Sequence, residues 1–383
     1  MINTLHMLFY HSVYPPEKAG GSLRAFNIAR LARNLFESVS IFAADEGNLY
    51  NGIFDGISIV QQNRYQNRID KMKYYTEGLL SKNFSYRVPE SAFDHKNSVL
   101  FQLEGPFFNN LVRKKNIRKF ILDEHNVYWE TLDFPSFELK KKIYHFLANK
   151  RDKEIEIQAL HDATHILVCS ERDKQVLTEN VQCLEDKMTV IPNCIVFDEY
   201  ENYVRNYSIP RVSDGPSQIV FVGSLLYEPN IDAVNIICKD IAPHFENDVK
   251  FLIIGKNPPK IRKPENVTFL GYIEDIKGAV LQSDICIAPL RYGSGTRLKI
   301  LEYLALGKPV ISTSKGAEGI EYTNGRDIII EDRFDKFTGR IHDLLNNRTL
   351  RKQLGTNGRE LVRTRYNWAI YQKPLQNAYE SCM

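Results

Sequence analysis

Short apolar runs alternate with longer amphipathic segments along almost the whole chain. We predict strands in the first half at residues 5–10, 39–43, 98–103, 119–123, 165–169 and 190–192, and in the second half at 218–222, 250–255, 267–271, 284–289, 309–312 and 327–330. Helical patterns fill the gaps, among them 22–35, 231–245, 274–282, 296–305, 334–345 and 349–363. Strands that alternate with helices are typical of a parallel sheet wrapped by helices, so the predicted fold class is α/β.

The pattern is interrupted between residues 198 and 217, where two prolines, a glycine and several polar residues occur. A chain of 383 residues also exceeds a single comfortable core. We therefore predict two Rossmann-like, doubly wound domains, residues 1–197 and 218–365, joined by this linker. Ligands of such sheets bind beyond the carboxyl ends of the strands, so we expect the two domains to face each other across a cleft.

The segment 285–313 carries the strongest chemical signal. A loop of small residues separates a buried strand from an amphipathic helix, and its two glycines let backbone amides approach an anion at the helix N-terminus. Arg297 and Lys299 can supply charge against a diphosphate, and Glu302 can accept hydrogen bonds from a ribose diol. The segment therefore predicts a nucleotide-diphosphate site. The alternative is a glycine-loosened turn followed by a helix with solvated charges.

This segment resembles the nucleotide-sugar site of the retaining glycosyltransferases of family 4, the large group 1 family with the GT-B fold. Further matches follow in order along the chain: a Gly-Gly loop at 19–21, Leu122-Asp-Glu-His-Asn126, Ile191-Pro-Asn193, Phe221-Val-Gly-Ser224 with Pro229-Asn230, and Phe251-Leu-Ile-Ile-Gly255. Their order and spacing make the resemblance specific. It implies that the terminal segment 366–383, with Trp368, Tyr371, Leu375 and Tyr379 at helical spacing, packs back on the first domain, and we interpret these aromatic residues as packing positions.

The resemblance implies transfer of a sugar, with retention of configuration, from a nucleotide-diphosphate sugar to an acceptor hydroxyl in glycan, polysaccharide or glycolipid assembly. The departing diphosphate would accept the acceptor's proton, so stabilisation of its charge matters more than a protein nucleophile. The catalytic residues expected on this basis are His125, Arg297, Lys299 and Glu302. The expected donor-binding residues are Gly20, Gly21, Gly223, Gly255, Tyr272, Gly293, Ser294, Gly295 and Thr296. Glu104, Asp123 and Glu124 are the expected acceptor contacts.

Two departures from the family pattern affect these expectations. The family usually carries two glutamates with seven residues between them, and here Ser294 stands at the first position, ahead of Glu302. Many relatives also place an arginine and a lysine after the first strand of the second domain, whereas residues 223–230 contain no cation. Our hypothesis is that Arg297 and Lys299 replace those two charges, which leaves the identity of the sugar open.

We predict no metal ion, cofactor or disulfide. The sequence contains no Asp-x-Asp, no carboxylate pair of the kind that flanks a bond in glycosidases, and six cysteines without a Cys-x-x-Cys pair. The first apolar stretch is not preceded by a basic region, and no apolar run reaches about 18 residues. We therefore expect a cytoplasmic protein.

Basic residues gather in the first half, although the net charge of +3 gives no reason to expect nucleic-acid binding. The clusters are Arg64, Arg68, Lys71 and Lys73, then Arg113–Lys115 with Arg118 and Lys119, then Lys140–Lys142, and then Lys150 and Arg151. They are either solvated helix faces, because acidic residues interleave with some of them, or a face toward the inner surface of a membrane or a phosphate-bearing lipid acceptor.

The expected partners are a UDP- or GDP-sugar donor and a glycan, glycolipid or small-molecule acceptor. Two other functions stay open at this point. One is a nucleotide-sugar epimerase of the same architecture, and the other is a non-catalytic scaffold or binding subunit, which Ser294 would favour. A dinucleotide-dependent oxidoreductase is disfavoured, because no Gly-x-Gly-x-x-Gly follows the first strand.

Overall fold

A computed structural model describes residues 2–11, 13–14, 20–45, 49–63, 88–94, 98–130, 139–208, 215–246, 248–293 and 297–383, with only the backbone of 139–149. The chain divides into two compact units: unit 1 is Met1–Pro192 with Tyr371–Met383, and unit 2 is Asn193–Ile370. The domain boundaries predicted from the sequence, at residues 197 and 365, lie five residues from these divisions. Among the described residues, no helix has both the length and the apolar character that a membrane span needs.

Unit 1 is built on one eight-stranded sheet. Its strands are β1 (Thr4–Phe9), β2 (Ser38–Asp45), β3 (Tyr50–Phe54), β4 (Ile57–Asn63), β5 (Val99–Glu104), β6 (Phe120–Glu124), β7 (His165–Val168) and β8 (Met188–Val190). They lie in the order β3-β4-β2-β1-β5-β6-β7-β8, and β3 alone pairs antiparallel to its neighbour. This is the doubly wound α/β sheet that the alternation of strands and helices predicts.

The hairpin of β3 and β4 is absent from the sequence prediction. Its turn is Asp55-Gly56, in which both residues have positive φ, 49° and 71°. An Asp-Gly pair between two apolar runs is a strong hairpin signal, because this turn needs positive φ at both central positions. That dipeptide is the feature that could have identified the hairpin.

Helices and short turns connect the strands of unit 1. They are α1 (Gly20–Ala32), α3 (Asn109–Lys114), α4 (Leu139–Asp162), α5 (Glu171–Asn180), α12 (Gln372–Glu380), η2 (Glu90–Phe93), η3 (Pro106–Phe108), η4 (Tyr128–Glu130) and η5 (Glu185–Lys187). Helix α1 begins at Gly20, two residues before the predicted start at 22, so Ser22 lies inside its first turn with its side chain buried. Gly20 and Gly21 therefore form the start of a helix.

Unit 2 contains a six-stranded sheet in the order β11-β10-β9-β12-β13-β14, with all pairs parallel. Its strands are β9 (Ser217–Val222), β10 (Val249–Ile254), β11 (Val267–Gly271), β12 (Ile285–Ala288), β13 (Val310–Ser312) and β14 (Ile329–Ile330). Its helices and helical turns are α6 (Phe197–Asn206), α7 (Glu228–Ile236), η6 (Ile237–Ile241), η7 (Ala242–His244), α8 (Ile276–Gln282), α9 (Leu298–Ala305), α10 (Phe334–Asn346), α11 (Arg348–Arg365) and η8 (Trp368–Tyr371).

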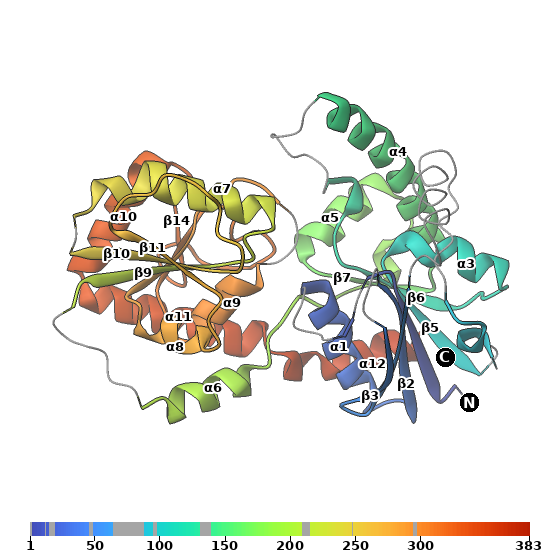
Figure 1. Cartoon of the computed structure of the whole chain (residues 1–383). Helices are drawn as coiled ribbons and strands as arrows, with labels where there is room; N and C mark the ends of the chain where they lie inside the picture. Colours follow the sequence, from blue (N-terminus) through green and yellow to red (C-terminus); the bar gives the residue numbers. More distant parts are fainter. Residues whose placement is uncertain are drawn as a thin grey trace. The chain divides into compact units, whose positions relative to one another are not determined.

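Helices cover both faces of this sheet, with α7 and α10 on one face and α9 and α11 on the other (Figure 1). Burial on both faces explains why the central strands are almost continuously apolar. Phe221 of β9, Phe251 of β10 and Phe337 of α10, for example, are each fully buried in one core cluster. The second predicted sheet is thus confirmed, with strand bounds within two residues of the prediction.

The segment predicted as a linker begins with a helix. Residues Phe197–Asn206 form α6, in which Phe197 and Tyr200 are buried and three residues apart. That spacing places both side chains on one face of a helix. The helical pattern is hard to recognise in the sequence, because most of the residues around these two are polar. Helix α6 belongs to unit 2 and contacts α9 there.

The terminal helix α12 belongs to unit 1, where it packs against α1. The ring of Tyr379 meets that of Phe36 edge-on at 5.1 Å, and the side-chain amide of Gln372 donates to the Leu31 carbonyl. In each sheet the first strand lies between neighbours whose connections run in opposite directions: β1 between β2 and β5, and β9 between β10 and β12. The carboxyl ends beside such switch points are where ligands of doubly wound folds bind.

Candidate active site

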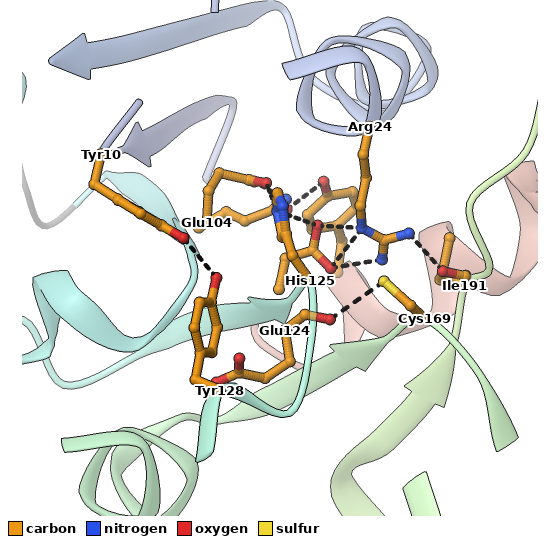
Figure 2. Close-up of polar contacts among 11 residues, drawn as sticks. Tyr10, Arg24, Glu104, Glu124, His125, Tyr128, Cys169 and Ile191 are labelled. Atoms are coloured by element: carbon orange, nitrogen blue, oxygen red, sulfur yellow. Dashed lines mark hydrogen bonds and ion pairs between the residues drawn. The ribbon is translucent and has the colours of Figure 1, made fainter. Parts of the chain in front are cut away.

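The carboxyl ends of β5 and β6 bring the first group of predicted residues together. The two strands are parallel neighbours with Glu104 paired to Asp123, so His125 emerges beside both carboxylates. Its Nε2 lies 2.8 Å from Oε2 of Glu104 and 3.5 Å from Oδ2 of Asp123 (Figure 2). All three side chains are buried, His125 with 8 % of its surface exposed.

Arg24 is a buried member of this cluster that the sequence analysis misses. It comes from α1 and donates from Nε to Asp123 Oδ2 at 2.9 Å and from Nη2 to Oδ1 at 2.6 Å. Its Nη1 donates to the Ile191 carbonyl at 2.6 Å (Figure 2). Two-point contact of this kind fixes both planar groups, and here it fixes the carboxylate that lies beside His125.

The charges of this cluster determine the protonation of His125. Burial alone would lower its pKa, but hydrogen bonds and charges from Asp123 and Glu104 outweigh burial and raise the pKa to about 9. Burial would likewise raise the pKa of Asp123, yet Arg24 and His125 hold it well below its usual range. These contacts favour the imidazolium form of His125 at neutral pH. Burial and the Asp123 charge raise the pKa of Glu104, while its hydrogen bonds with His125 and Gln102 oppose that shift.

One edge of the His125 ring faces the start of α1. A Cβ on Gly21 would lie 3.1 Å from Nδ1, and the ring stacks on Phe9 with centroids 5.8 Å apart. Nε2 is bonded to Glu104, so the other ring nitrogen, Nδ1, faces Gly21. The lack of a side chain on Gly21 leaves space beside Nδ1. Gly21 thus lies beside His125 at the start of a helix, and the predicted contact of Gly20 and Gly21 with the donor stays a prediction.

Glu104, Asp123 and Glu124 are at most 2 % exposed, which bears on their expected contact with an acceptor. The oxygens of Glu104 are bonded to His125 and to the amide of Gln102, and those of Asp123 to Arg24. Their geometry favours support of His125 over direct contact with an acceptor. The acceptor role stays a prediction.

Glu124 points away from this cluster, as expected for the residue after Asp123 in a strand. Neither of its carboxylate oxygens has a hydrogen-bond partner among the described residues, and burial together with the charge of Glu156 raises its pKa well above the usual range. Burial also raises the pKa of Glu156 to about 8, although its carboxylate accepts from the backbone N–H of Tyr128 at 3.0 Å. Burial therefore favours the protonated form of both carboxyl groups.

Glu104, Asp123 and His125 also lie close enough together to share a cation, with one ligand atom of each within 4.8 Å of the others. Arg24 already donates to both oxygens of Asp123, and its positive charge would repel a second cation there. The donor set thus suits a proton on His125 better than a metal ion. The metal-free site stays a prediction.

In unit 2, Lys299 occupies the first turn of α9 at the carboxyl end of β9. Its Nζ donates to Oδ1 of Asn230 at 2.6 Å and lies 4.3 Å from the ring centre of Phe221. A Cβ on Gly223 would lie 2.8 Å from Nζ, so the absence of a side chain there makes room for the ammonium group. Gly223 and Lys299 therefore lie next to each other, and their predicted roles toward the donor stay predictions.

Arg297 precedes Lys299 and is buried, with 8 % of its surface exposed. The backbone of Gly293, with φ of 108°, passes so close that a Cβ there would lie 2.7 Å from Nη2 of Arg297. Burial and the neighbouring Arg297 charge lower the pKa of Lys299 to about 7. Two cations are thus held close together at a helix N-terminus, an arrangement that an anion would stabilise.

Glu302 faces a residue that the sequence analysis assigns to the linker. The hydroxyl of Tyr200 in α6 donates to the Glu302 carboxylate, and the ammonium of Lys277 lies 4.3 Å from the centre of the Tyr200 ring. Burial raises the pKa of Glu302, while Tyr200, Lys277 and Lys299 oppose that shift. Its carboxylate is therefore oriented by contacts within unit 2.

Two further predicted donor-site residues, Gly255 and Tyr272, follow strands at the same edge of the sheet. Gly255 follows β10. It is packed so closely against Gly223 that a Cβ on Gly255 would collide with the Gly223 carbonyl oxygen. Tyr272 follows β11 with 62 % of its surface exposed, and the ammonium of Lys256 lies 4.4 Å from its ring centre. Ser294, Gly295 and Thr296 lie outside the described residues.

The basic clusters are only partly described. Arg113 lies 3.6 Å from Asp162, Lys115 donates to Glu90 at 2.5 Å and Arg151 to Asp152 at 2.7 Å. The pairs of Arg113 and Lys115 are partly exposed, whereas the side chains of Arg151 and Asp152 are only 15 % and 16 % exposed. Both interpretations of the basic clusters stay predictions. Residues 64–73 and the side chains of Lys140–Lys142 lie outside the part of the chain that the structure describes.

Comparison with known proteins agrees with this reading of unit 2. Residues 216–347 match the family model of the group 1 glycosyl transferases. The chain is 22% identical over 291 residues to the uncharacterized glycosyltransferase MJ1069 of Methanocaldococcus jannaschii, a region covering 73% of this chain and 71% of that protein. It is 25% identical over 243 residues to the capsular polysaccharide biosynthesis glycosyltransferase CapM of Staphylococcus aureus, covering 58% of this chain and 63% of CapM.

Among solved structures, that of Anabaena Alr3699/HepE in complex with UDP-glucose has the same fold. Its TM-score is 0.61 at 13% sequence identity, and the match covers 98% of this chain and 99% of that one. Two parallel doubly wound sheets, the matched family region and the glycosyltransferases among the relatives lead to one conclusion. The chain is a glycosyltransferase with the GT-B fold.

Proposed function

We propose that this glycosyltransferase belongs to family 4 and transfers a sugar, with retention of configuration, from a nucleotide-diphosphate sugar to an acceptor hydroxyl. The observation that carries the proposal is the pairing of Lys299 with Arg297 at the N-terminus of α9. Two basic side chains held close together at a helix N-terminus suit an anion, because the helix dipole and both charges favour negative charge there. A diphosphate supplies two adjacent negative charges and suits this pair.

The same pair accounts for the absence of cations from residues 223–230. The Lys299 ammonium donates to Asn230 and lies against Gly223. Its positive charge is therefore next to the 223–230 loop, which has no cation of its own. These contacts support the hypothesis that Arg297 and Lys299 take over the diphosphate. Charge supplied by the protein also makes a metal ion unnecessary in this proposal.

The nucleoside would extend from the diphosphate along the edge of the same sheet. Glu302, held by Tyr200, is assigned to the ribose hydroxyls, and Tyr272 with Lys256 offers an exposed aromatic surface for the base. Alr3699/HepE was solved with UDP-glucose, which supports a nucleotide-sugar donor for a protein of the same fold. UDP and GDP are the two nucleotides proposed.

His125 of unit 1 is assigned to the transferred sugar. With Nε2 bonded to Glu104, the imidazolium presents Nδ1–H on the side of Gly21, where it can donate to a sugar hydroxyl. A fixed positive charge there would also stabilise negative charge that grows on the leaving diphosphate. In this mechanism the diphosphate accepts the acceptor's proton as the new bond forms on the same face of the sugar.

The acceptor is proposed to be a growing glycan or glycolipid of a surface polysaccharide, or a related small molecule. CapM, a relative over part of the chain, acts in capsular polysaccharide biosynthesis, which supports this class. Peripheral membrane contact through the basic part of α4 is included in the proposal. Sedimentation of the protein with anionic but not with neutral vesicles would test it.

The direct test is turnover. The protein is incubated with UDP- and GDP-sugars and a mixture of glycan and lipid-linked acceptors, and the anomeric proton of the product is followed by NMR. Retention is read from the first-formed anomer. A product of inverted configuration would contradict the mechanism, and a change in the donor sugar without transfer would indicate the epimerase.

A non-catalytic binding subunit is the second candidate, and Ser294 is the observation that favours it. The usual glutamate at this position helps to orient the transferred sugar, so a serine weakens or replaces that contact. A protein that binds nucleotide sugars but gives no product with any donor and acceptor would support this alternative. Restored or increased turnover in Ser294→Glu would instead support an enzyme whose sugar contact has been altered.

A further inference from the structure

A chain of buried hydrogen bonds links the terminal helix α12 to His125. The hydroxyl of Tyr379 donates to Oε1 of Gln102 at 2.7 Å, and Nε2 of Gln102 donates to Oε1 of Glu104 at 2.6 Å. The other oxygen of Glu104 accepts from His125 at 2.8 Å (Figure 2). The side chains of Tyr379, Gln102 and Glu104 are fully buried, so these groups have no water to replace a lost partner.

Glu104 and Tyr379 together set the direction of this chain. A side-chain amide can present either its oxygen or its nitrogen to a neighbour. The Glu104 carboxylate only accepts and therefore holds the NH₂ group of Gln102, while the Tyr379 hydroxyl supplies the donor that the Gln102 oxygen needs on the side of α12. If the amide turned over, its oxygen would face the Glu104 carboxylate, which is unfavourable without water.

We propose that Tyr379 and Gln102 are positioning residues through which the terminal helix fixes the orientation and the charge of His125. Gln102 holds Glu104, Glu104 holds Nε2 of the ring, and Nδ1 is thereby aimed at the space beside Gly21. The proposal rests on the assignment of His125 to the transferred sugar, but the hydrogen-bond chain can be examined without any substrate. It gives the terminal aromatic residue a role beyond packing.

Among the described residues, the charged and titratable groups that interact with His125 or with its carboxylate partners come from α1, β5, β6, α12 and the residue after β7. They are Arg24 of α1, Glu104 of β5, Asp123 and Glu124 of β6, Cys169 after β7, and Tyr379 of α12. Asp123 is fixed by Arg24 independently of α12, whereas Glu104 receives its second hydrogen bond only through Gln102. Removal of the Tyr379 hydroxyl should therefore change the position of Glu104, one of the two carboxylates beside His125, and leave the other, Asp123, in place.

The test is the titration of His125 in the full chain, followed by NMR of isotope-labelled histidine. The sequence has nine histidines, so the His125 signals are assigned by their loss in His125→Gln. In the wild type we expect an imidazolium that persists above pH 8 and a neutral form with its proton on Nε2. A wild-type His125 that titrates near the ordinary histidine value would overturn the proposal without any variant.

The variant is Tyr379→Phe, which removes one oxygen and keeps the ring against Phe36. We expect the pKa of His125 to fall by about one unit, because Glu104 loses its orientation. In turnover assays kcat should fall about tenfold with little change in KM for the donor. Glu104→Gln should give a larger fall in the pKa of His125, since it removes the charge itself.

The matched control is Tyr366→Phe. Tyr366 is a buried tyrosine of unit 2 whose hydroxyl accepts from the backbone N–H of Glu321 at 2.6 Å. It should cost a similar amount of thermal stability and leave the titration of His125 unchanged. Equal titration curves for Tyr379→Phe and the wild type would overturn the positioning role, even if the protein shows no transferase activity. A shifted titration without turnover would leave the positioning role intact and count against the proposed function.

Discussion

The ammonium group of Lys299 lies 2.6 Å from the side-chain oxygen of Asn230 and 4.3 Å from the ring centre of Phe221. These contacts do not neutralise it, because an amide and an aromatic ring carry no net charge. Burial and Arg297 therefore lower the pKa of Lys299 to about 7. In the proposed function, the diphosphate of the donor supplies the negative charge that Lys299 lacks among these contacts.

Donor affinity should depend on pH through Lys299. A bound diphosphate raises the pKa of Lys299, so above pH 7 binding takes up a proton. Affinity for a nucleotide sugar should then fall as the pH rises from 7 toward 9, by at most about tenfold per pH unit. Isothermal titration calorimetry in buffers of different ionisation enthalpy measures both the affinity and the proton uptake.

The control variants for this linkage are conservative. Lys299→Arg keeps a charge that does not titrate, so its affinity should be nearly constant over the same range. Lys256→Arg changes a lysine at the same sheet edge that lies over Tyr272, and it should keep the wild-type pH dependence. A nucleotide sugar has no ionisation of its own near neutral pH, which is why it is preferred to a free diphosphate. Proton release on binding, or identical profiles for wild type and Lys299→Arg, would contradict this assignment.

Gly223→Ala should impair donor binding specifically. The added Cβ would lie 2.8 Å from Nζ of Lys299 and from the Asn230 amide, so one of them must move. We expect affinity for the nucleotide sugar to fall at least about tenfold, equivalent to about 1.4 kcal/mol. Gly339→Ala in α10 is the control, because no atom lies within 4 Å of its new Cβ and alanine favours a helix. Equal donor affinity in the two variants would count against the site.

Loss of Arg24 should strongly destabilise unit 1. Arg24→Met leaves Asp123 buried and without its cation, and a broken buried pair of this kind costs about 3–5 kcal/mol. Urea unfolding followed by tryptophan fluorescence gives the change in the free energy of unfolding. The control is Arg30→Met. Arg30 lies on the same helix as Arg24 and forms a partly exposed ion pair with Asp55, so its loss should cost at most about 1 kcal/mol of unfolding free energy. Similar losses in both variants would mean that the Arg24–Asp123 pair is not the buried anchor described above.

Glu156 should make the protein less stable as the pH rises. Burial raises its pKa in the folded state to about 8, above the ordinary glutamate value of 4.5. Between these two values the folded protein holds a proton that the unfolded chain releases, so the stability is complete at low pH and is lost toward pH 8. Glu156→Gln keeps an acceptor for the Tyr128 N–H and should weaken the fall in melting temperature between pH 5 and 8. The exposed Glu185→Gln should leave that fall unchanged; a Glu156→Gln variant with the wild-type slope would show that another group causes it.

The sequence predicts the sheets better than it predicts the contacts around the site. Buried parallel strands are short apolar runs, so β5, β6 and β12 can be recognised locally, and topology then places His125 and Lys299 at sheet edges. Arg24 could not be found in this way. In an amphipathic helix an arginine resembles a solvated residue, and its partner Asp123 lies 99 residues away.

Tyr200 and Tyr379 illustrate the same limit. Tyr200 lies in a segment whose polar composition resembles a linker, and its bond to Glu302 exists only after α6 has packed in unit 2. Tyr379 has the helical spacing of a packing residue, while its hydroxyl meets Gln102 from 277 positions away. Periodicity identifies the buried face of each helix but carries no information about which distant polar group that face meets.

The central claim is that the edge of the unit 2 sheet binds a nucleotide-diphosphate sugar with charges supplied by the protein. The most direct measurement is thermal-shift binding across nucleoside diphosphates and their sugar conjugates, with magnesium and with a chelator, for the wild type, Glu302→Ala and Lys299→Met. We predict stabilisation by one nucleotide series that persists in the chelator and disappears in both variants. Absence of a shift with every nucleotide, or a shift that requires magnesium and survives in both variants, would contradict the claim.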